Sequence, residues 1–197
     1  MSKKESIIRA ASILFSKRGF ENTRMSEISR MTGAAEGTIF YHFKSKEDLF
    51  LAILEQFRQE IMGEFDRYLG EMKFQSGMQM LEGCISFYLS LADTMEDRFL
   101  LLHRHDAYEL ARVNGACKGH LEAVYNGLVG IFERALVRGQ ADGSIAPMPA
   151  NKIAMIIFLM VDGLVRFNTY KLYDASALYD DLLSSIHRIL VNLQPSG

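Results

Sequence analysis

The sequence has 197 residues, of which 49% are apolar, so the chain is long enough to bury a core as one or two domains. Its two cysteines, Cys84 and Cys117, are far apart, which argues against a disulfide framework and against a cysteine-based zinc site. Residues 1–50 hold 9 Lys or Arg against 6 Asp or Glu, whereas residues 51–197 hold 13 against 18. The net charge of −2 therefore conceals a basic N-terminal part, which suits nucleic acid but also occurs on many domains that never meet it.

The N-terminal residues give no sign of a signal peptide, because Ser2 to Glu5 leads directly into an amphipathic pattern that carries charges throughout. The longest apolar run, residues 153–161, falls well short of the roughly 20 residues that span a bilayer. We therefore expect a soluble cytoplasmic protein with no membrane partner.

Three short helices are predicted at the start of the chain. Apolar residues at helical spacing indicate helices over residues 3–18, 25–32 and 36–42, and the last two are joined by a few residues around Gly33. Gly33 suits a backbone position with a positive φ at the end of the second helix. Two short helices with so tight a joint form a helix-turn-helix pattern. The expected core residues are Ile28, Met31 and Ile39, together with Leu14 and Phe15.

The third helix and its flank carry groups that suit DNA. Tyr41, His42 and Lys46 offer a hydroxyl, an imidazole and an ammonium group, all of which bind phosphate oxygens. Gly37 leaves little bulk where a backbone can approach DNA closely. Residues 36–49 are therefore predicted to form a DNA-docking surface.

Residues 7–50 resemble the TetR family of one-component transcriptional regulators, through the run FSKRGFENTRMSEISRMTGAAEGTIFYHFKSKEDLF. The features at fixed spacing are Gly19-Phe20, Thr23, Ile28, Gly33, the run from Gly37 to Phe43, and Lys46. The resemblance implies an all-helical homodimer. Three N-terminal helices would bind operator DNA, and a larger C-terminal part would bind a small molecule and dimerise.

Carried onto this sequence, the resemblance makes residues 36–41 the recognition helix and places Arg24 and Met25 at the start of the supporting helix near DNA. Tyr41, His42 and Lys46 become anchors on the DNA backbone. The predicted DNA-binding residues are Arg24, Met25, Glu36, Gly37, Thr38, Phe40, Tyr41, His42 and Lys46.

Two residues depart from the family pattern. Ala35 stands where the family often has a serine that caps the recognition helix, and an absent cap costs only about 1 kcal/mol. Glu36 stands where a lysine is common, and a carboxylate repels phosphates unless it accepts a hydrogen bond from a cytosine amino group. The base preference of the family therefore does not transfer to this chain.

The remaining helices are predicted from apolar residues spaced by three or four positions, with Ser45 as the N-cap of the first of them. They cover residues 46–68, 78–95, 97–111, 121–137, 151–170 and 177–193, which makes an all-α chain of about nine helices. We expect a helix-turn-helix DNA-binding domain over residues 1–47 and a ligand-binding and dimerisation domain over residues 48–197.

The last two predicted helices are more apolar around their girth than the end of a chain needs. Such a pair can build a four-helix interface with its symmetry mate, which predicts a homodimer through the last two helices. The alternative is that both helices only close the core of one subunit.

His103 and His105, with Asp106 and Glu109, at first resemble metal ligands. On one helix, however, the two histidines diverge, and only His105 and Glu109 share a face. Two ligands make a weak site, so no metal is predicted. Because no catalytic triad, phosphate loop or paired-carboxylate motif occurs at a suitable spacing, we predict no catalytic residue and no cofactor, and we do not expect an enzyme.

The chain contains 11 Met, 13 Phe and 8 Tyr, most of them after residue 50. Such residues usually form core, but together they allow an adaptable cavity for an apolar or aromatic ligand. Asp162 lies in an otherwise apolar helix, where Arg166 is its simplest partner and a ligand contact is the alternative. The candidate pocket residues are Phe65, Phe87, Leu91, His103, Tyr108, Tyr125, Phe158 and Asp162.

These features predict a ligand-responsive transcriptional regulator, in the first place a repressor. It would bind a partly palindromic operator as a dimer and be released by a small apolar or aromatic effector. The alternative is a DNA-binding regulator with no small-molecule switch, whose C-terminal domain would be fully packed.

Overall fold

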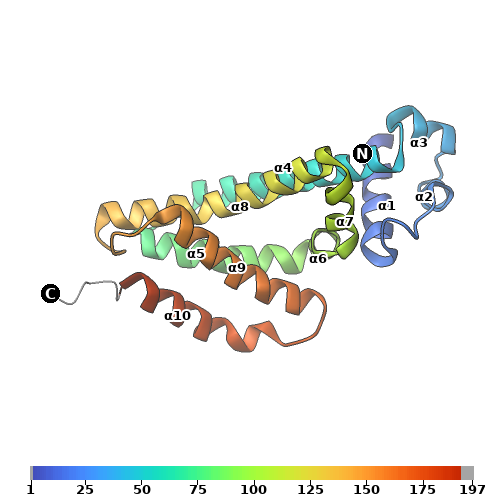
Figure 1. Ribbon diagram of the computed structural model, residues 1–197. Helices are drawn as coiled ribbons and strands as arrows, with labels where there is room; N and C mark the ends of the chain where they lie inside the picture. Colours follow the sequence, from blue (N-terminus) through green and yellow to red (C-terminus); the bar gives the residue numbers. More distant parts are fainter. Residues whose placement is uncertain (1, 192–197) are drawn as a thin grey trace. The chain divides into compact units, whose positions relative to one another are not determined.

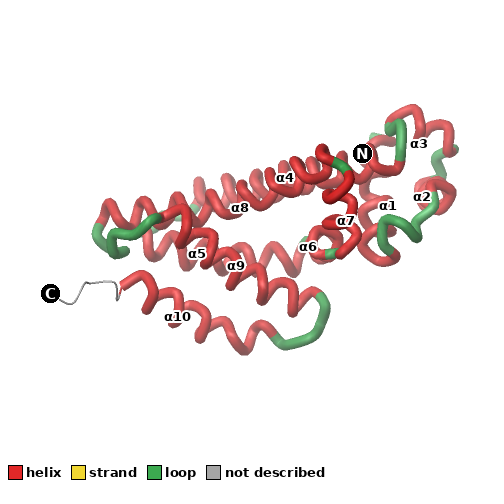
Figure 2. The backbone as a smooth tube through the Cα atoms, viewed as in Figure 1, coloured by secondary structure: helices red, strands yellow, loops and turns green. Residues whose placement is uncertain are grey.

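The computed structural model describes residues 2–191, and over that range the chain is built from helices with no strand (Figure 1, Figure 2). The elements are α1 Lys3–Arg18, α2 Met25–Thr32, α3 Glu36–His42, α4 Lys46–Glu71, α5 Gly77–Thr94, α6 Glu96–His103, α7 His105–Val113, α8 Gly115–Asp142, α9 Ala150–Thr169, the 3-10 helix η1 Ala175–Leu178, and α10 Tyr179–Val191. The predicted all-α class is confirmed, with one α helix more than expected among the described residues. Within the same range, no helix combines the length and the apolar character needed to cross a membrane.

The first four helices begin where the sequence predicts, and the first three also end there. The backbone N–H of Asp48 donates to Oγ of Ser45 over 3.1 Å, which confirms Ser45 as the cap of α4. Gly33 has a φ of 69°, the left-handed conformation expected of the residue that ends α2. These boundaries depend on residues within one turn of each helix end, so the local sequence is enough to place them.

The segment predicted as one helix over residues 97–111 is two helices, because the backbone becomes extended at Arg104. The Arg104 guanidinium donates to the carbonyl of Ser16 over 3.1 Å. The carboxylate of Asp106, close by, accepts the backbone N–H of Phe20 over 2.8 Å. The break between α6 and α7 therefore coincides with contacts to the end of α1, a segment far away in the sequence.

α8 begins at Gly115, well before its predicted start at residue 121. Asn114 caps the helix, since its Oδ1 accepts the backbone N–H groups of Ala116 and Cys117 over 3.0 and 3.1 Å. Gly115 and Gly119 therefore both lie within a continuous helix. An N-cap stabilises the first turn by about 1 kcal/mol and helps offset the cost of glycine there.

The last two helices lie close to their predicted positions. α9 is shifted by one residue from the prediction, and α10 begins two residues later than predicted because η1 precedes it. The predicted end of the last helix, Leu193, lies outside the described residues.

The described chain packs as two compact units. Residues 2–60 and 95–124 form one, which we call the head unit, and residues 61–94 and 125–191 form the other, the body unit. α4 and α8 contribute residues to both units, so each unit combines segments that are distant in the sequence. The functional division at residue 47 stays a prediction.

Three phenylalanines form an aromatic cluster in the core of the head unit. Phe15, Phe20 and Phe50 are almost fully buried, with ring centroids 5.3 to 5.9 Å apart. α1, which carries Phe15, packs along α6 (Figure 1). Ile28 is the buried residue of α2, whereas Met31 is 50% exposed. The placement of Met31 in the core is therefore wrong, because this short helix buries only one narrow side.

Glu55 on α4 holds several partners in the head unit. Its carboxylate accepts two hydrogen bonds from Arg58, over 2.7 and 3.0 Å, and one from Gln59 over 2.7 Å. His120 of α8 lies 3.6 Å away. The hydrogen bonds from Arg58 are the largest cause that lowers the pKa of Glu55 from 4.5 to about 2. This carboxylate therefore stays charged far into acid.

Glu55→Gln should lower stability in a pH-dependent way. Because the pKa of Glu55 is depressed in the folded state, its stabilisation is complete above pH 4.5 and is lost as the pH falls toward about 2. The side chain is 32% exposed, so we expect no more than about 1 kcal/mol at neutral pH. Denaturant unfolding at a series of pH values should show the difference between wild type and variant shrinking toward acid. A difference that stays constant from neutral pH down to pH 3 would contradict this role.

Candidate functional sites

Side chains of α2 hold the joint between α2 and α3. The Ser29 hydroxyl donates to the carbonyl of Ala34 over 2.7 Å, and the backbone N–H of Ala34 donates to Oγ1 of Thr32 over 3.3 Å. Ala35, the residue before α3, provides no side-chain cap, as its sequence identity predicts. The angle between the two helices is therefore set by α2 and its turn rather than by a cap on α3.

One side of α3 is exposed to solvent. Ile39 is fully buried, whereas Phe40 and Tyr41 are 46% and 84% exposed, and Glu36 and Gly37 are exposed as well. This side presents a carboxylate, bare backbone at the glycine, and two aromatic rings, one with a hydroxyl. A short helix with an exposed side of this kind fits the major groove of DNA.

Glu27 holds the start of α2. Its carboxylate accepts the backbone N–H of Arg24 over 3.0 Å and pairs with the guanidinium of Arg18. The hydrogen bond from Arg24 is the largest cause that lowers the pKa of Glu27. The backbone of Arg24 is thus fixed while its side chain stays exposed.

All nine residues predicted to contact DNA belong to the head unit. The exposed ones are Arg24, Glu36, Gly37, Phe40 and Tyr41. The half-buried ones are Met25, Thr38, His42 and Lys46. Their contact with DNA stays a prediction, and one of them has another role in this conformation.

Lys46 uses its ammonium group inside the head unit. Its Nζ donates to the carbonyls of Phe20, Thr23 and Glu21 over 2.8, 3.3 and 3.4 Å. It also lies 4.4 Å from the centroid of the Phe20 ring, within the range of a cation–π contact. An ammonium group has three N–H donors, so the loop between α1 and α2 takes all of them. A phosphate contact by Lys46 would require one of these bonds to open.

The run His103-Arg104-His105-Asp106 falls at the break between α6 and α7. His103 ends α6 and is buried, whereas His105 begins α7 and is exposed, with its Nε2 3.4 Å from Oε1 of Glu109. The side chains of Arg104 and Asp106 lie 3.3 Å apart and both bind the end of α1. Among residues 2–191, no group of three or more His, Cys, Asp or Glu side chains could hold a metal ion.

The candidate pocket residues are distributed over both units. His103 and Tyr108 belong to the head unit, and the other six belong to the body unit. Phe65 and Phe87 form one aromatic group there, with ring centroids 5.1 Å apart, and Tyr68 stacks on Phe87 at 4.2 Å. Leu91, on the same helix as Phe87, is buried.

A second aromatic group surrounds Phe158 in the body unit. The rings of Tyr88 and Tyr125 each lie 5.9 Å from that of Phe158. The hydroxyl of Tyr88 donates to Oδ1 of the buried Asp162 over 2.7 Å. The sequence did not predict this partner, because Tyr88 lies on α5 and Asp162 on α9. A ligand contact by any candidate pocket residue stays a prediction.

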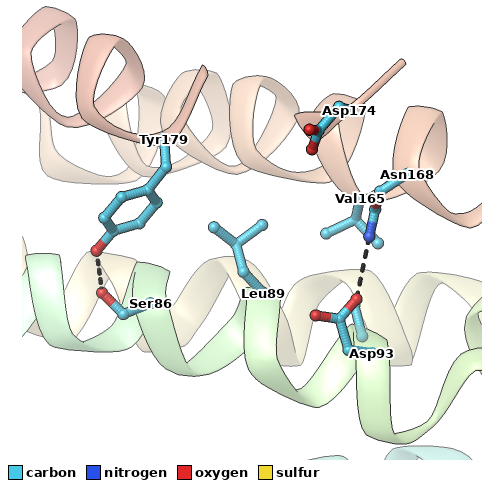
Figure 3. A pocket seen from close by; sticks show the side chains of 8 residues that line it. Ser86, Leu89, Asp93, Val165, Asn168, Asp174 and Tyr179 are labelled. Atoms are coloured by element: carbon cyan, nitrogen blue, oxygen red, sulfur yellow. Dashed lines mark hydrogen bonds between the residues drawn. The ribbon is translucent and has the colours of Figure 1, made fainter. Parts of the chain in front are cut away.

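A cavity of about 490 Å³ lies in the body unit between α5, α9 and the start of α10 (Figure 3). Its lining residues are Ser86, Leu89, Ala92, Asp93, Val165, Asn168, Asp174 and Tyr179. The Asn168 amide donates to Oδ1 of Asp93 over 3.0 Å, and the hydroxyls of Ser86 and Tyr179 share a hydrogen bond. None of the candidate pocket residues lines this cavity. Sequence reasoning missed it because α6, α7 and α8 separate the contributing helices along the chain.

The first part of the chain matches a known family. Residues 7–53 match the family model described as bacterial regulatory proteins, tetR family. This range includes α2, α3 and their joint, and with them the exposed side of α3. The chain therefore has the DNA-binding domain of the TetR family. It is a transcriptional regulator that binds DNA through a helix-turn-helix.

Relatives of this chain extend over nearly its full length. It is 27% identical to the fatty acid metabolism regulator protein of Bacillus subtilis, over 92% of this chain and 94% of that protein. The crystal structure of the regulator FadR from Bacillus subtilis in complex with stearoyl-CoA has a TM-score of 0.76 at 22% identity, over 92% of this chain and 96% of that one. A regulator from Saccharomonospora viridis in complex with choline has a TM-score of 0.78 at 20% identity, over 97% and 96%. These structures share the fold, and the relatives are named as regulators, which is not an enzymatic role.

Proposed function

We propose that this TetR-family regulator acts in the cytoplasm as a homodimeric repressor that binds a partly palindromic operator and is released by a small effector. The observation that carries the proposal is the exposed side of α3, where Tyr41 is 84% exposed beside a fully buried Ile39. Exposed aromatic side chains on a short helix indicate a surface that binds a partner. The two heads of a dimer enter successive major grooves of the operator.

In this proposal, residues at the start of α2 and on α3 contact both the phosphates and the base edges of the DNA. Arg24 and Tyr41 bind phosphates and supply affinity for any sequence, with His42 beside them. Thr38 and Glu36 approach base edges, and Gly37 allows close contact. The carboxylate of Glu36 accepts a hydrogen bond from a cytosine amino group. Where it faces another base, it repels the phosphates of the DNA backbone.

The last two helices form the proposed dimer interface. Along α9, α10 and the segment between them, the exposed apolar side chains are Met155, Ile156, Leu159, Phe167, Tyr170, Leu172, Tyr173, Leu178 and Val191. Val161 and Val165 of α9 are buried and lie on another side of that helix. The exposed side fits a second copy of the chain, in an interface to which each subunit contributes two helices.

The proposed effector is small and hydrophobic or aromatic, and it binds in the body unit. The cavity of about 490 Å³ and the aromatic groups around Phe87 and Phe158 support this part of the proposal. Related structures hold stearoyl-CoA in one case and choline in another, so the fold accommodates ligands of different chemistry. The effector releases DNA because it binds better to a conformation with low affinity for the operator.

DNA selected from a random-sequence library tests the DNA-binding surface. Tyr41→Ala should lower the affinity for every selected sequence by about a hundredfold, since a hydrogen bond to a charged group contributes about 1.5 kcal/mol and a dimer loses two. Arg24→Ala should make the slope of log affinity against log salt shallower by about 1.8, because two phosphates are no longer neutralised. Fluorescence anisotropy over a series of KCl concentrations measures both quantities.

Arg67→Ala is the matched control, because Arg67 is an exposed arginine of the body unit paired with Glu64. It should leave affinity and salt slope unchanged. If Arg24→Ala and Tyr41→Ala also leave them unchanged, the proposed surface is wrong. If no compound of a hydrophobic library lowers operator affinity, the protein is a regulator without a small-molecule switch.

A further inference from the structure

The cavity between α5, α9 and the start of α10 has an apolar middle. Leu89, Ala92 and Val165 line it, and the last two are themselves buried. Its volume of about 490 Å³ lies in the range of small-molecule sites. The exposed apolar residues of α9, such as Phe167, lie on the side of the helix away from Val165. On α9, the cavity and the proposed dimer interface therefore use different sides of the helix.

One end of the cavity is neutral. The Ser86 hydroxyl donates to the carbonyl of Glu82 over 2.9 Å and shares a hydrogen bond with the hydroxyl of Tyr179 (Figure 3). Because Ser86 donates its hydrogen to Glu82, it accepts from Tyr179. Both hydroxyl hydrogens are therefore in use, and this end offers a ligand contact surface without charge.

The other end carries two carboxylates. Asp93 of α5 and Asp174, which precedes η1, line the cavity on either side of Asn168 (Figure 3). The amide of Asn168 donates to Oδ1 of Asp93 over 3.0 Å, a hydrogen bond that leaves the negative charge in place. None of the described residues that line the cavity is Lys or Arg. Charges of one sign in a concave site attract cations and repel anions.

We propose that this cavity binds an organic cation with an apolar body. The ammonium group lies between Asp93 and Asp174, and the hydrocarbon part covers Leu89 and Val165. The inference rests on the proposed function, because it names the class of effector that the body unit takes. A neutral ligand of the same size gains the apolar contact but not the charge pairing, and an anionic ligand is repelled by both carboxylates.

Isothermal titration calorimetry with three compounds that share a phenyl ring tests the charge preference. Benzyltrimethylammonium is the cation, benzyl alcohol the neutral compound and benzoate the anion. We expect the cation to bind about tenfold more tightly than either of the others, and this advantage to shrink as KCl is raised, because exposed charge pairs are screened. Equal affinity for the three compounds, tighter binding of benzoate, or no binding of the cation would overturn the proposal.

A double variant, Asp93→Asn with Asp174→Asn, removes the two charges and keeps the shape of the site. We expect it to bind benzyltrimethylammonium about tenfold more weakly, because both exposed charge pairs with the ammonium group are lost. The matched control is Asp180→Asn with Asp181→Asn, which changes the total charge equally at two exposed residues of α10 outside the cavity. Its affinity should equal that of the wild type, and equal weakening in both double variants would refute the site.

Operator release separates this inference from the proposed function. If the cation binds in a carboxylate-dependent way but operator affinity is unchanged, the cation site is supported and its role as the effector site is refuted. A different outcome is that compounds release the operator while they bind the Asp93→Asn, Asp174→Asn variant as tightly as the wild type. That result supports the small-molecule switch and overturns the proposed cation site. Carboxylate-dependent binding that also lowers operator affinity supports both.

Discussion

Gly77→Ala should lower the melting temperature of the protein by about 10 °C. A methyl group on Gly77 would lie 2.0 Å from the backbone nitrogen and 2.3 Å from Cα of Gly139, and 2.7 Å from the carbonyl oxygen of Ala135. These are backbone atoms, so no side-chain rotation relieves the overlap and α5 has to move away from α8. That movement also stretches the 2.7 Å hydrogen bond from the backbone N–H of Gly77 to Asp142. Overpacking of this kind costs about 3 kcal/mol, which a chain of this length shows as roughly 10 °C.

Gly63→Ala is the matched control for this experiment. Gly63 lies inside α4 and is exposed, and an added methyl group would meet nothing within 4 Å. Alanine is the better helix former by about 1 kcal/mol, so this variant should melt slightly higher than the wild type. Thermal unfolding followed by circular dichroism compares the two. If the Gly77→Ala protein has the same melting temperature as the wild type, the contact between α5 and α8 at Gly139 is looser than described.

Lys46→Met should destabilise the head unit by about 3 kcal/mol. Methionine keeps most of the length of lysine but removes the ammonium group that three carbonyls of residues 20, 21 and 23 accept from. A buried hydrogen bond to a charged group contributes about 1.5 to 3 kcal/mol, and these three are only partly buried, so about 1 kcal/mol for each gives about 3 kcal/mol in total. Hydrogen exchange of the amides between α1 and α2, followed by mass spectrometry, should become correspondingly faster.

Lys44→Met removes the same charge two residues away and serves as the control. Lys44 is exposed and makes no hydrogen bond or ion pair within the described residues, so stability should change by no more than about 0.5 kcal/mol. Comparison of the two variants also decides between two roles for Lys46. Unchanged exchange with weaker, less salt-dependent DNA binding in Lys46→Met would make Lys46 a phosphate contact, and faster exchange makes it a support for the loop.

Much of the helix-turn-helix could be predicted because its signals are local. The bounds of α1, α2 and α3 follow from apolar spacing and from glycine at the ends of α1 and α2. Ser45 caps α4 within a single turn, and Ala35 fails to cap α3 for an equally local reason. The spacing of these features is also what carries the resemblance to the TetR family, which the family model matches over residues 7–53.

The body unit could be predicted as helices but not as a site. Aromatic and aliphatic residues at helical spacing identify helices without showing which side chains meet, and the candidate pocket residues were chosen on that basis. Tyr88 and Asp162 meet because α5 packs against α9. The carboxylates of Asp93 and Asp174 line one cavity although α6, α7, α8 and α9 lie between them along the chain.

The sequence by itself determined the helical class, the bounds of the DNA-binding helices and the regulator family, because each depends on residue types at short and regular spacing. Only the tertiary structure decided that Arg104 lies at a break between two helices, that Lys46 binds carbonyls, and that two aspartates line a cavity. In each of these cases the partner group lies more than 20 positions away along the chain. Helix periodicity describes which residues share a side, and packing alone decides what that side meets.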